Sequence, residues 1–227
     1  MIGVFGGTFD PIHLGHLRTA LDCVQSLDLA ELRLLPLKVA VHREQPVASA
    51  ALRLAMTRLG TGAEPRFVVD DRELTRDGPS YTVDTLASLR EEFGPARPLC
   101  LLVGGDAFAG FFDWHRPRAI LDLAHLVVMQ RPGAPMARDP ALRAETGRRR
   151  ADQPRALQQS PAGRIFFQTV TQLDISSTRI RRMLAAGMSP RYLLPDDVLA
   201  LIEREQCYGP ASAAGRSPVP DPVQEDR

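Results

Sequence analysis

The sequence predicts an α/β protein with a doubly wound, Rossmann-like parallel sheet and helices on both faces. Apolar runs of strand length alternate along the chain with longer segments of helical pattern, and this alternation is typical of parallel βαβ units. The first such run, at residues 2–5, leads directly into a glycine turn. Because ligands bind beyond the carboxyl ends of the strands in such a sheet, the loop after this strand is where a site is expected.

The individual elements follow from the same patterns. Strands are expected at residues 2–5, 32–37, 66–70, 99–104, 126–130 and 165–170. Helices are expected at residues 15–27, 49–59, 80–93, 116–123, 177–186 and 195–205. Ser80 and Ser176 stand where N-cap residues are preferred, because a serine hydroxyl can accept a hydrogen bond from the first helical turn.

The length of 227 residues suits one α/β domain that buries a full sheet between two helix layers. We place this domain at residues 1–209. Residues 133–163 are polar and rich in arginine, so we expect a surface insertion with one helix there. Residues 210–227 are expected to form a disordered C-terminal tail.

Composition limits the expected partners and compartment. The net charge of +1 arises from charges of mixed sign, which indicates neither a nucleic-acid nor a membrane partner. Cys23, Cys100 and Cys207 are scattered and odd in number, as expected in a reducing compartment without a disulfide framework. Since the chain shows no signal peptide and no apolar run of membrane length, the expected location is cytoplasmic. A homo-oligomer stays open, because pattern alone does not separate an apolar surface patch from core.

The loop after the first strand carries a candidate phosphate site. Gly6 and Gly7 let the backbone approach a ligand closely, and Pro11 interrupts the path before the next helix. His13 and His16 then lie one turn apart on one face of that helix, within its first turn. Backbone N–H groups and the positive end of the helix dipole lie there too, so a polyphosphate would meet donors of three kinds. This arrangement favours nucleotidyl transfer.

A zinc site and two better-known phosphate motifs fit these residues less well. Paired histidines on one helix face can bind zinc, but no Cys or Glu in this segment supplies further ligands. The glycines of the segment do not make a G-x-G-x-x-G fingerprint, and no G-x-x-x-x-G-K-S/T occurs in the chain. A dehydrogenase and a P-loop enzyme are therefore disfavoured.

A second candidate anion site lies at residues 174–182. It follows an expected strand and begins a helix, so that hydroxyls and free N–H groups meet arginines one turn further on. Taken alone, this segment is equally well explained as an ordinary N-cap on a basic amphipathic helix. Two helix-terminus anion sites in one nucleotide-type sheet indicate instead a triphosphate held from both sides.

Residues 6–16 and 175–181 together resemble the signatures of the nucleotidylyltransferase superfamily, and specifically those of bacterial nicotinate-nucleotide adenylyltransferases. Apart from residues 133–163 and the tail, the resemblance covers nearly the whole chain. Further matching segments follow in the family's order at residues 71–74, 78–86 and 104–108, at Trp114 and at residues 191–195.

The resemblance implies a fold of the nucleotidylyltransferase type and the last shared step of NAD biosynthesis. In that step ATP and nicotinate mononucleotide give nicotinate adenine dinucleotide (deamido-NAD) and pyrophosphate. The acceptor's own 5′-phosphate is the nucleophile, so the enzyme aligns two phosphates and stabilises the charge that develops on them. Mg²⁺ is implied as a companion of the ATP phosphates rather than as an ion in a protein cage.

The resemblance also implies roles for individual residues. The implied catalytic residues are His13, Arg43 and His16, of which His16 acts on the α-phosphate. Trp114 is implied to stack on the pyridine ring, and backbone N–H groups at Tyr81 and Thr82 to receive the carboxylate, with Arg43 as a further contact of this nucleotide. The implied ATP-binding residues are Gly6, Gly7, Thr8, Phe9, His13, His16, Gly104, Asp106, Ile175, Ser176, Ser177, Thr178 and Arg181.

One segment departs from the family pattern. Members usually carry Pro-Pro-His-Lys or Pro-Pro-His-Arg after the second strand, whereas this chain has Val-Ala-Val-His-Arg at residues 39–43. Arg43 keeps the cation and can meet phosphate bidentately. Without the stiffening prolines, we expect this loop to be mobile until substrate binds.

Related functions stay open beside this one. Transfer to phosphopantetheine or glycerol phosphate would share the first signature, but residues 80–86 and Trp114 argue against such acceptors. Nicotinamide mononucleotide is a closer alternative, since it differs by one functional group. A class I aminoacyl-tRNA synthetase would need a tRNA-reading domain, for which the chain is too short. A non-catalytic nucleotide sensor would bind ATP without turnover and would have no need of the histidine pair.

Overall fold

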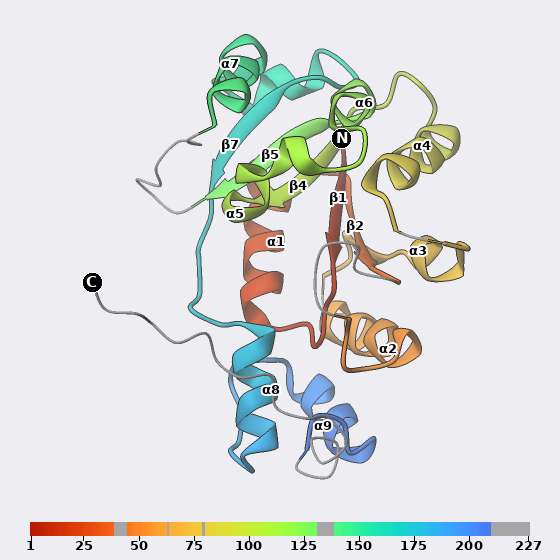
Figure 1. The fold of residues 1–227 in the computed structure, drawn as a ribbon, viewed down its shortest axis with the longest axis vertical. Coiled ribbons are helices and arrows are strands. Elements are labelled where there is room, and N and C mark those ends of the chain that lie inside the picture. Colours follow the sequence, from red (N-terminus) through yellow and green to blue (C-terminus); the bar gives the residue numbers. More distant parts are fainter. Residues whose placement is uncertain (39–44, 63, 79, 131–138, 210–227) are drawn as a thin grey trace.

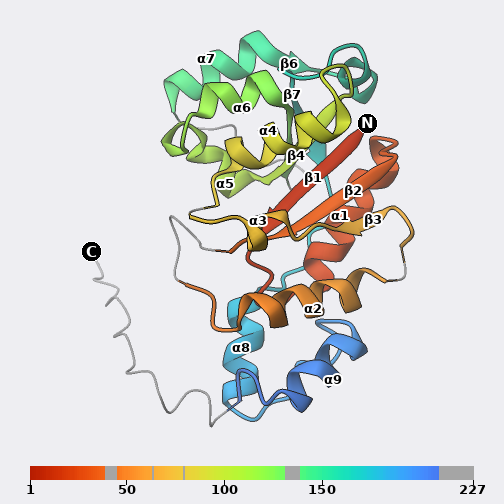
Figure 2. The ribbon, with the colours of Figure 1, turned by 90° about the vertical axis from the view of Figure 1, so that its right-hand side faces the viewer.

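The computed structural model describes residues 1–38, 45–62, 64–78, 80–130 and 139–209. It contains a seven-stranded sheet in the order β3-β2-β1-β4-β5-β7-β6, whose central strands are labelled in Figure 1 and whose edge strands β3 and β6 are labelled in Figure 2. Every strand pair is parallel. The strands are β1 (Ile2–Gly7), β2 (Glu31–Pro36), β3 (Phe67–Val69), β4 (Leu99–Gly104), β5 (His125–Gln130), β6 (Arg150–Ala151) and β7 (Ile165–Thr169). The predicted fold class, a doubly wound parallel sheet with helices on both faces, is confirmed.

The helices that the sequence predicts are all present, with ends shifted by one or two residues. They are α1 (Leu14–Ser26), α2 (Ala50–Thr61), α4 (Thr82–Phe93), α6 (Pro117–Leu123), α8 (Ser177–Ala185) and α9 (Asp196–Arg204). Helix α7 (Pro140–Arg149) is the one helix expected within residues 133–163. The structure adds the short helices α3 (Arg72–Thr75) and α5 (Gly105–Ala109) and two 3-10 turns, η1 (Phe111–Asp113) and η2 (Pro154–Gln158). Among the described helices, none is long and apolar enough to cross a membrane.

The two predicted N-caps have different outcomes. Ser176 caps α8 as expected, because its hydroxyl accepts a hydrogen bond from the Arg179 N–H. The prediction for Ser80 is wrong, since α4 starts two residues later and its N-cap is Tyr81. The Ser80 hydroxyl instead accepts a hydrogen bond from the Lys38 N–H and so ties the end of the β2 segment to the entry of α4.

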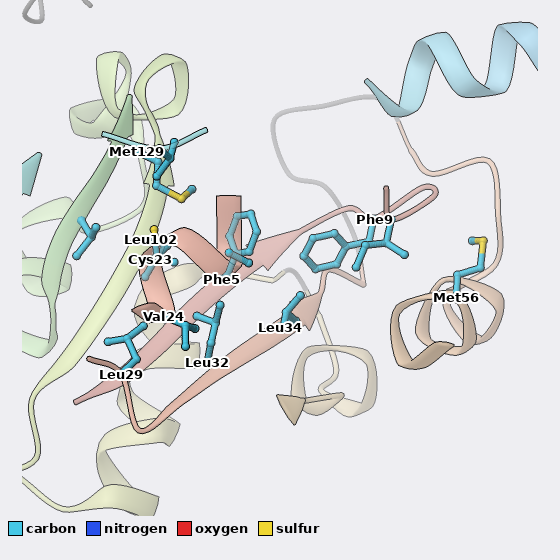
Figure 3. Close-up of a cluster of buried hydrophobic side chains, with 14 of the residues drawn as sticks. Phe5, Phe9, Cys23, Val24, Leu29, Leu32, Leu34, Met56, Leu102 and Met129 are labelled. Atoms are coloured by element: carbon cyan, nitrogen blue, oxygen red, sulfur yellow. The ribbon is translucent and has the colours of Figure 1, made fainter. Parts of the chain in front are cut away.

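Residues of β1, β2, β4, β5 and β7 pack into two separate cores, one on each face of the sheet. In β1, Phe5 packs with Cys23 and Val24 of α1 (Figure 3), whereas Ile2 and Val4 point to the opposite face. The apolar sides of α4 and α6 cover that second face. This period of two is what a strand between two helix layers requires.

The described part of the expected insertion, residues 139–163, contributes to the sheet and to the core. Its α7 buries Leu142 and Thr146, and η2 buries Leu157. The two-residue strand β6 pairs in parallel with β7 and forms one edge of the sheet. The segment therefore has the expected helix, and in addition a buried side and an edge strand. Its apolar residues Leu142 and Leu157 are spaced among arginines, which dominate the composition of the segment.

The strand order reverses direction between β1 and β4. The chain runs from β1 outward to β3 on one side and from β4 outward to β6 on the other, so the carboxyl ends of β1 and β4 border the switch point. Figures 1 and 2 show α2, α8 and α9 beyond the carboxyl end of β1. Both predicted anion-binding segments thus lie at the edge of the sheet where α/β folds bind ligands.

Candidate active site

Open space lies over the backbone at the ends of β1 and β4. Gly6 and Gly104 are both exposed. A Cβ built on Gly6 would approach no described atom closer than 3.9 Å, and one on Gly104 would meet none of them within 4 Å. Packing within the described protein therefore does not explain these two glycines, whereas the close approach of a ligand to the backbone would. Asp106, in the first turn of α5, lies exposed beside Gly104.

Side-chain packing and a hydrogen bond from α2 hold the loop after β1 in place. The Phe9 side chain is buried, and its backbone is in the left-handed region with φ of 46°. A Cβ on Gly7 would come within 2.6 Å of the Phe9 ring. The buried Arg53 of α2 donates a hydrogen bond of 2.7 Å from Nη1 to the Thr8 carbonyl oxygen. Gly7 is thus required by the Phe9 ring, and a long-range arginine that the sequence reasoning missed fixes the loop.

The two histidines form a stacked pair at the start of α1. His13 is the N-cap, one residue before the first turn where the sequence places it, and its Nδ1 accepts a hydrogen bond of 3.4 Å from the His16 N–H. The ring centroids lie 3.7 Å apart at an interplanar angle of 23°. A Cβ on Gly15 would come 3.0 Å from the His13 ring, so the absence of a side chain there makes room for the stack.

Both imidazoles are neutral at pH 7 in the free protein. Burial lowers the pKa of His13 to about 4. Burial, and then the neighbouring His13, lower the pKa of His16 well below its ordinary value. Because the Nδ1 of His13 accepts a hydrogen bond, its proton resides on Nε2, where it can be donated to a phosphate oxygen. The Nδ1 of His16 is buried and has no hydrogen-bond partner within the described residues.

We predict that His13 makes folding stability fall in mild acid. Its folded pKa of about 4 lies below the ordinary value of 6.5, so the unfolded chain binds more protons between these two values. The free energy of unfolding should therefore decrease as the pH is lowered from 6.5 towards 4, by roughly 3 kcal/mol from this residue. Urea denaturation across this range measures the slope.

The matched variant for this test is His13→Asn, which keeps an N-cap acceptor but cannot titrate. It should show a shallower loss of stability between pH 6.5 and 4 than the wild type. His125 and His16, whose pKa values burial also lowers, contribute to the pH dependence of both proteins. Equal slopes in the two proteins would contradict the prediction.

The second candidate anion site, at the start of α8, contacts the loop after β1. Ser177 Oγ at the start of α8 donates a hydrogen bond of 2.9 Å to the Pro11 carbonyl oxygen. Arg181 Nη1 donates one of 2.8 Å to the Asp10 carbonyl oxygen, and its Nη2 lies 3.4 Å from Thr178 Oγ1. The half-buried Ile175 places its carbonyl oxygen 3.5 Å from the Cβ position of Gly15. The structure thus brings together the residues that the sequence assigns to the triphosphate.

The residues assigned to the pyridine end also lie near one another. Thr82 is the first residue of α4, and the side chain of its N-cap residue, Tyr81, makes no cap hydrogen bond. The ring of Tyr81, its N-cap, stacks on His115 with centroids 4.3 Å apart and an interplanar angle of 29°. The adjacent Trp114 is half-buried, with its ring 5.6 Å from that of Phe111. Arg43 lies outside the described residues.

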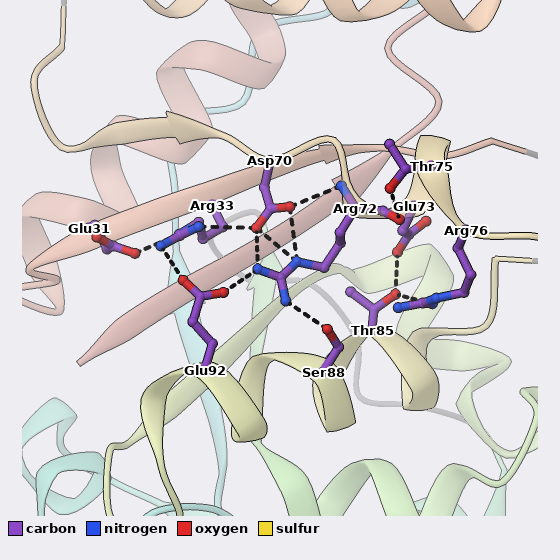
Figure 4. Close-up of polar contacts among 10 residues, drawn as sticks. All are labelled: Glu31, Arg33, Asp70, Arg72, Glu73, Thr75, Arg76, Thr85, Ser88 and Glu92. Carbon is purple, nitrogen blue, oxygen red and sulfur yellow. Dashed lines mark hydrogen bonds and ion pairs between the residues drawn. The ribbon is translucent and has the colours of Figure 1, made fainter.

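A polar network fixes the position of α4 (Figure 4). Arg72 of α3 binds the buried Asp70, and it also pairs with Glu92 and Ser88 of α4. Closer to the start of α4, Thr85 Oγ1 donates a hydrogen bond of 2.7 Å to the buried Glu73, whose pKa burial raises. The network holds the uncapped start of α4 in place.

Within the described residues, three or more His, Cys, Asp or Glu side chains nowhere gather as a protein metal site would require. The neutral imidazoles and the arginine at the loop instead suit the oxygen atoms of a phosphate chain.

Comparison with known proteins agrees with this geometry. The cytidylyltransferase-like family model matches residues 4–183. The chain is 50% identical over 209 residues to a probable nicotinate-nucleotide adenylyltransferase of Methylococcus capsulatus, covering 92% of this chain and 99% of that protein. The chain belongs to the cytidylyltransferase-like family, among the nicotinate-nucleotide adenylyltransferases. A second probable nicotinate-nucleotide adenylyltransferase, from Pseudomonas aeruginosa, is 48% identical over 207 residues, with 91% of this chain and 96% of that protein covered.

Solved structures of other nicotinate-nucleotide adenylyltransferases share the fold. A Plasmodium falciparum nicotinic acid mononucleotide adenylyltransferase complexed with NaAD superposes with a TM-score of 0.69 at 16% identity, covering 91% of this chain and 96% of that one. A putative nicotinate-nucleotide adenylyltransferase from Vibrio parahaemolyticus has a TM-score of 0.60 at 15% identity, with 91% and 94% covered.

Proposed function

We propose that this protein transfers the adenylyl group of ATP to nicotinate mononucleotide, giving deamido-NAD and pyrophosphate in NAD biosynthesis. The observation that carries the proposal is the contact between the two anion-binding segments at the switch point of the sheet. Relatives that share about half of the sequence over nearly their full length are named for this activity.

The triphosphate is proposed to lie between the histidine pair and the start of α8. The Nε2–H of His13 and the imidazole of His16 donate to oxygens of the phosphates, and His16 stabilises the α-phosphate as it is attacked. Arg181 holds the β- and γ-phosphates. Because the Ser177 hydroxyl hydrogen is engaged with the Pro11 carbonyl, the contribution of Ser177 is its backbone N–H at the helix start.

Mg²⁺ is proposed to enter as part of the MgATP substrate. Magnesium commonly keeps several waters and binds through substrate phosphates rather than through a dedicated protein cage. The residues around the loop after β1 fit this mode, since they offer hydrogen-bond donors to phosphate oxygens rather than a set of carboxylates to a cation. When bound, the ion would neutralise charge on the pyrophosphate as it leaves.

The pyridine end of the acceptor is proposed to bind where α4 begins. The N–H groups of the first turn and the positive end of the helix dipole face a carboxylate favourably. Trp114 supplies an aromatic face for the ring. An amide at the same position would lose the charge and would place an NH2 group against N–H donors, so the site favours nicotinate over nicotinamide.

The first experiment is pyrophosphate release by the purified protein with MgATP and either nicotinate mononucleotide or nicotinamide mononucleotide. We expect turnover with at least about tenfold preference for the acid in kcat/KM, and a product with the mass of deamido-NAD. Equal use of both acceptors would contradict the role of α4 while leaving adenylyl transfer in place. Absence of turnover with either acceptor would overturn the proposed function.

A matched pair of variants tests the α4 site directly. Thr82→Pro removes the N–H at the first helical position, where proline is otherwise well tolerated. The Tyr81 backbone, at φ of −90° and ψ of 130°, suits a residue before proline. We expect the preference for the acid to fall about tenfold in Thr82→Pro and to persist in Thr82→Ala, which keeps the N–H. An unchanged preference in Thr82→Pro would contradict the assignment.

A further inference from the structure

Asp10 is a buried carboxylate at which distant segments of the chain meet. Its Oδ2 accepts a hydrogen bond of 2.7 Å from the Val47 N–H, and its Oδ1 accepts one of 3.1 Å from the Ala48 N–H. The Tyr208 hydroxyl donates a further, short hydrogen bond to Oδ1. Only 3% of Asp10 and of Tyr208 is exposed. Three donors from two remote segments therefore fix both oxygens of this carboxylate.

The Arg181 side chain also contacts Asp10, and its closest contact there is with the backbone carbonyl oxygen of Asp10. Its Nη1 donates to the Asp10 carbonyl oxygen at 2.8 Å, whereas the same nitrogen is 3.8 Å from the carboxylate Oδ2. The Arg181 side chain keeps 24% of its surface exposed, so it can still meet a ligand. The carboxylate is thus near enough to attract the guanidinium but does not form a close ion pair with it.

Tyr208 comes from the segment after α9, beyond the residues that the family model matches. It packs in the core on the α1 face of the sheet, which places its hydroxyl at Asp10. Burial and the adjacent Asp10 raise the pKa of this phenol, so the hydroxyl remains a donor throughout the physiological range. The contact is therefore permanent at working pH and does not act as a pH switch.

We propose that Tyr208 is a positioning residue for ATP: by holding the Asp10 carboxylate, it keeps that carboxylate from pairing closely with Arg181 and leaves the guanidinium free for the triphosphate. Without the phenol, Oδ1 keeps only the Ala48 N–H as a donor. Among the described residues, Arg181 is the cation within 4 Å of this carboxylate, with Nη1 3.8 Å from the other oxygen, Oδ2, so a small turn of either side chain would pair them closely. A close Asp10–Arg181 ion pair would compete with the phosphates for the same positive charge. This inference rests on the proposed function only in taking ATP as the ligand of Arg181.

The test is Tyr208→Phe, which removes one oxygen atom and keeps the ring in the core. We expect the KM for ATP, and the Kd for ATP measured by calorimetry without acceptor, to rise about fivefold. The KM for nicotinate mononucleotide and kcat should stay within about twofold. Tyr192→Phe is the matched control, because Tyr192 is 81% exposed and the same change there should leave all of these constants unaltered.

A test in the Arg181→Ala variant distinguishes a positioning role of Tyr208 from a general effect on stability. In Arg181→Ala, the additional change Tyr208→Phe should leave the Kd for ATP unaltered, because the residue through which Tyr208 acts is gone. A fivefold loss that persists in that background would overturn the proposal. So would a lowered melting temperature with an unchanged Kd for ATP, which is the result of a purely structural role. Because the Kd needs no turnover, this test gives a result even where the proposed acceptor fails.

Discussion

Replacing His16 with alanine is expected to lower kcat by about 10²–10³-fold while changing the KM for ATP much less. A preorganised donor aimed at charge that develops in the transition state is worth this much when it is removed. The His16 ring is held by packing against the Phe9 ring, with centroids 5.2 Å apart, and by the His13 stack, so its orientation is set before the nucleotide arrives. Its contact with the α-phosphate should strengthen as the bond to pyrophosphate breaks. Losing that contact should therefore lower kcat much more than it weakens ATP binding.

His16→Gln supplies the comparison for this experiment. The amide keeps a hydrogen-bond donor on a flexible side chain, so we expect part of the lost rate to return. Calorimetry with ATP should show that both variants still bind the nucleotide, and thermal unfolding should show that both remain folded. A kcat within a few-fold of the wild type in His16→Ala would remove this residue from the chemistry.

The longer helices and strands of this fold are predictable because the spacing of apolar residues within each segment indicates them. The runs that became β1, β4 and β5 are nearly continuous apolar segments, as strands buried on both faces must be. The helices α3 and α5 have four and five residues, too few to show a helical period, and β6 has only two. Their existence depends on neighbours that are remote in sequence.

The candidate site likewise contains residues that the local sequence predicts and residues that it does not. The histidine pair and the start of α8 lie in short motifs, and the structure brings both to the Asp10–Pro11 backbone. Arg53, which supports the Thr8 carbonyl, lies 45 positions away, and the contact between Tyr208 and Asp10 spans 198. One signal could have revealed Arg53, since it is an arginine within the apolar pattern of a helix that packs on the core. Nothing in the local sequence around Tyr208 indicates a partner near the first strand.

Replacing Arg181 with alanine is expected to raise the KM for ATP by about 10–100-fold, with a smaller effect on kcat. Charge-assisted hydrogen bonds to phosphate are among the strongest single contacts, and loss of the guanidinium leaves the β- and γ-phosphates with helix N–H donors alone. The contact with the Asp10 carbonyl oxygen holds the side chain between the two anion-binding segments, so little ordering remains to be done when ATP binds.

Arg182→Ala is the matched control, because Arg182 is the next residue of α8 and carries the same charge but is exposed. A general loss of positive potential would affect the two variants equally and would fade with added salt. A specific contact affects Arg181→Ala alone and persists at higher salt. An unchanged KM for ATP in Arg181→Ala would reject its role in binding the triphosphate. It would also reject the positioning role of Tyr208, since that role acts through this guanidinium.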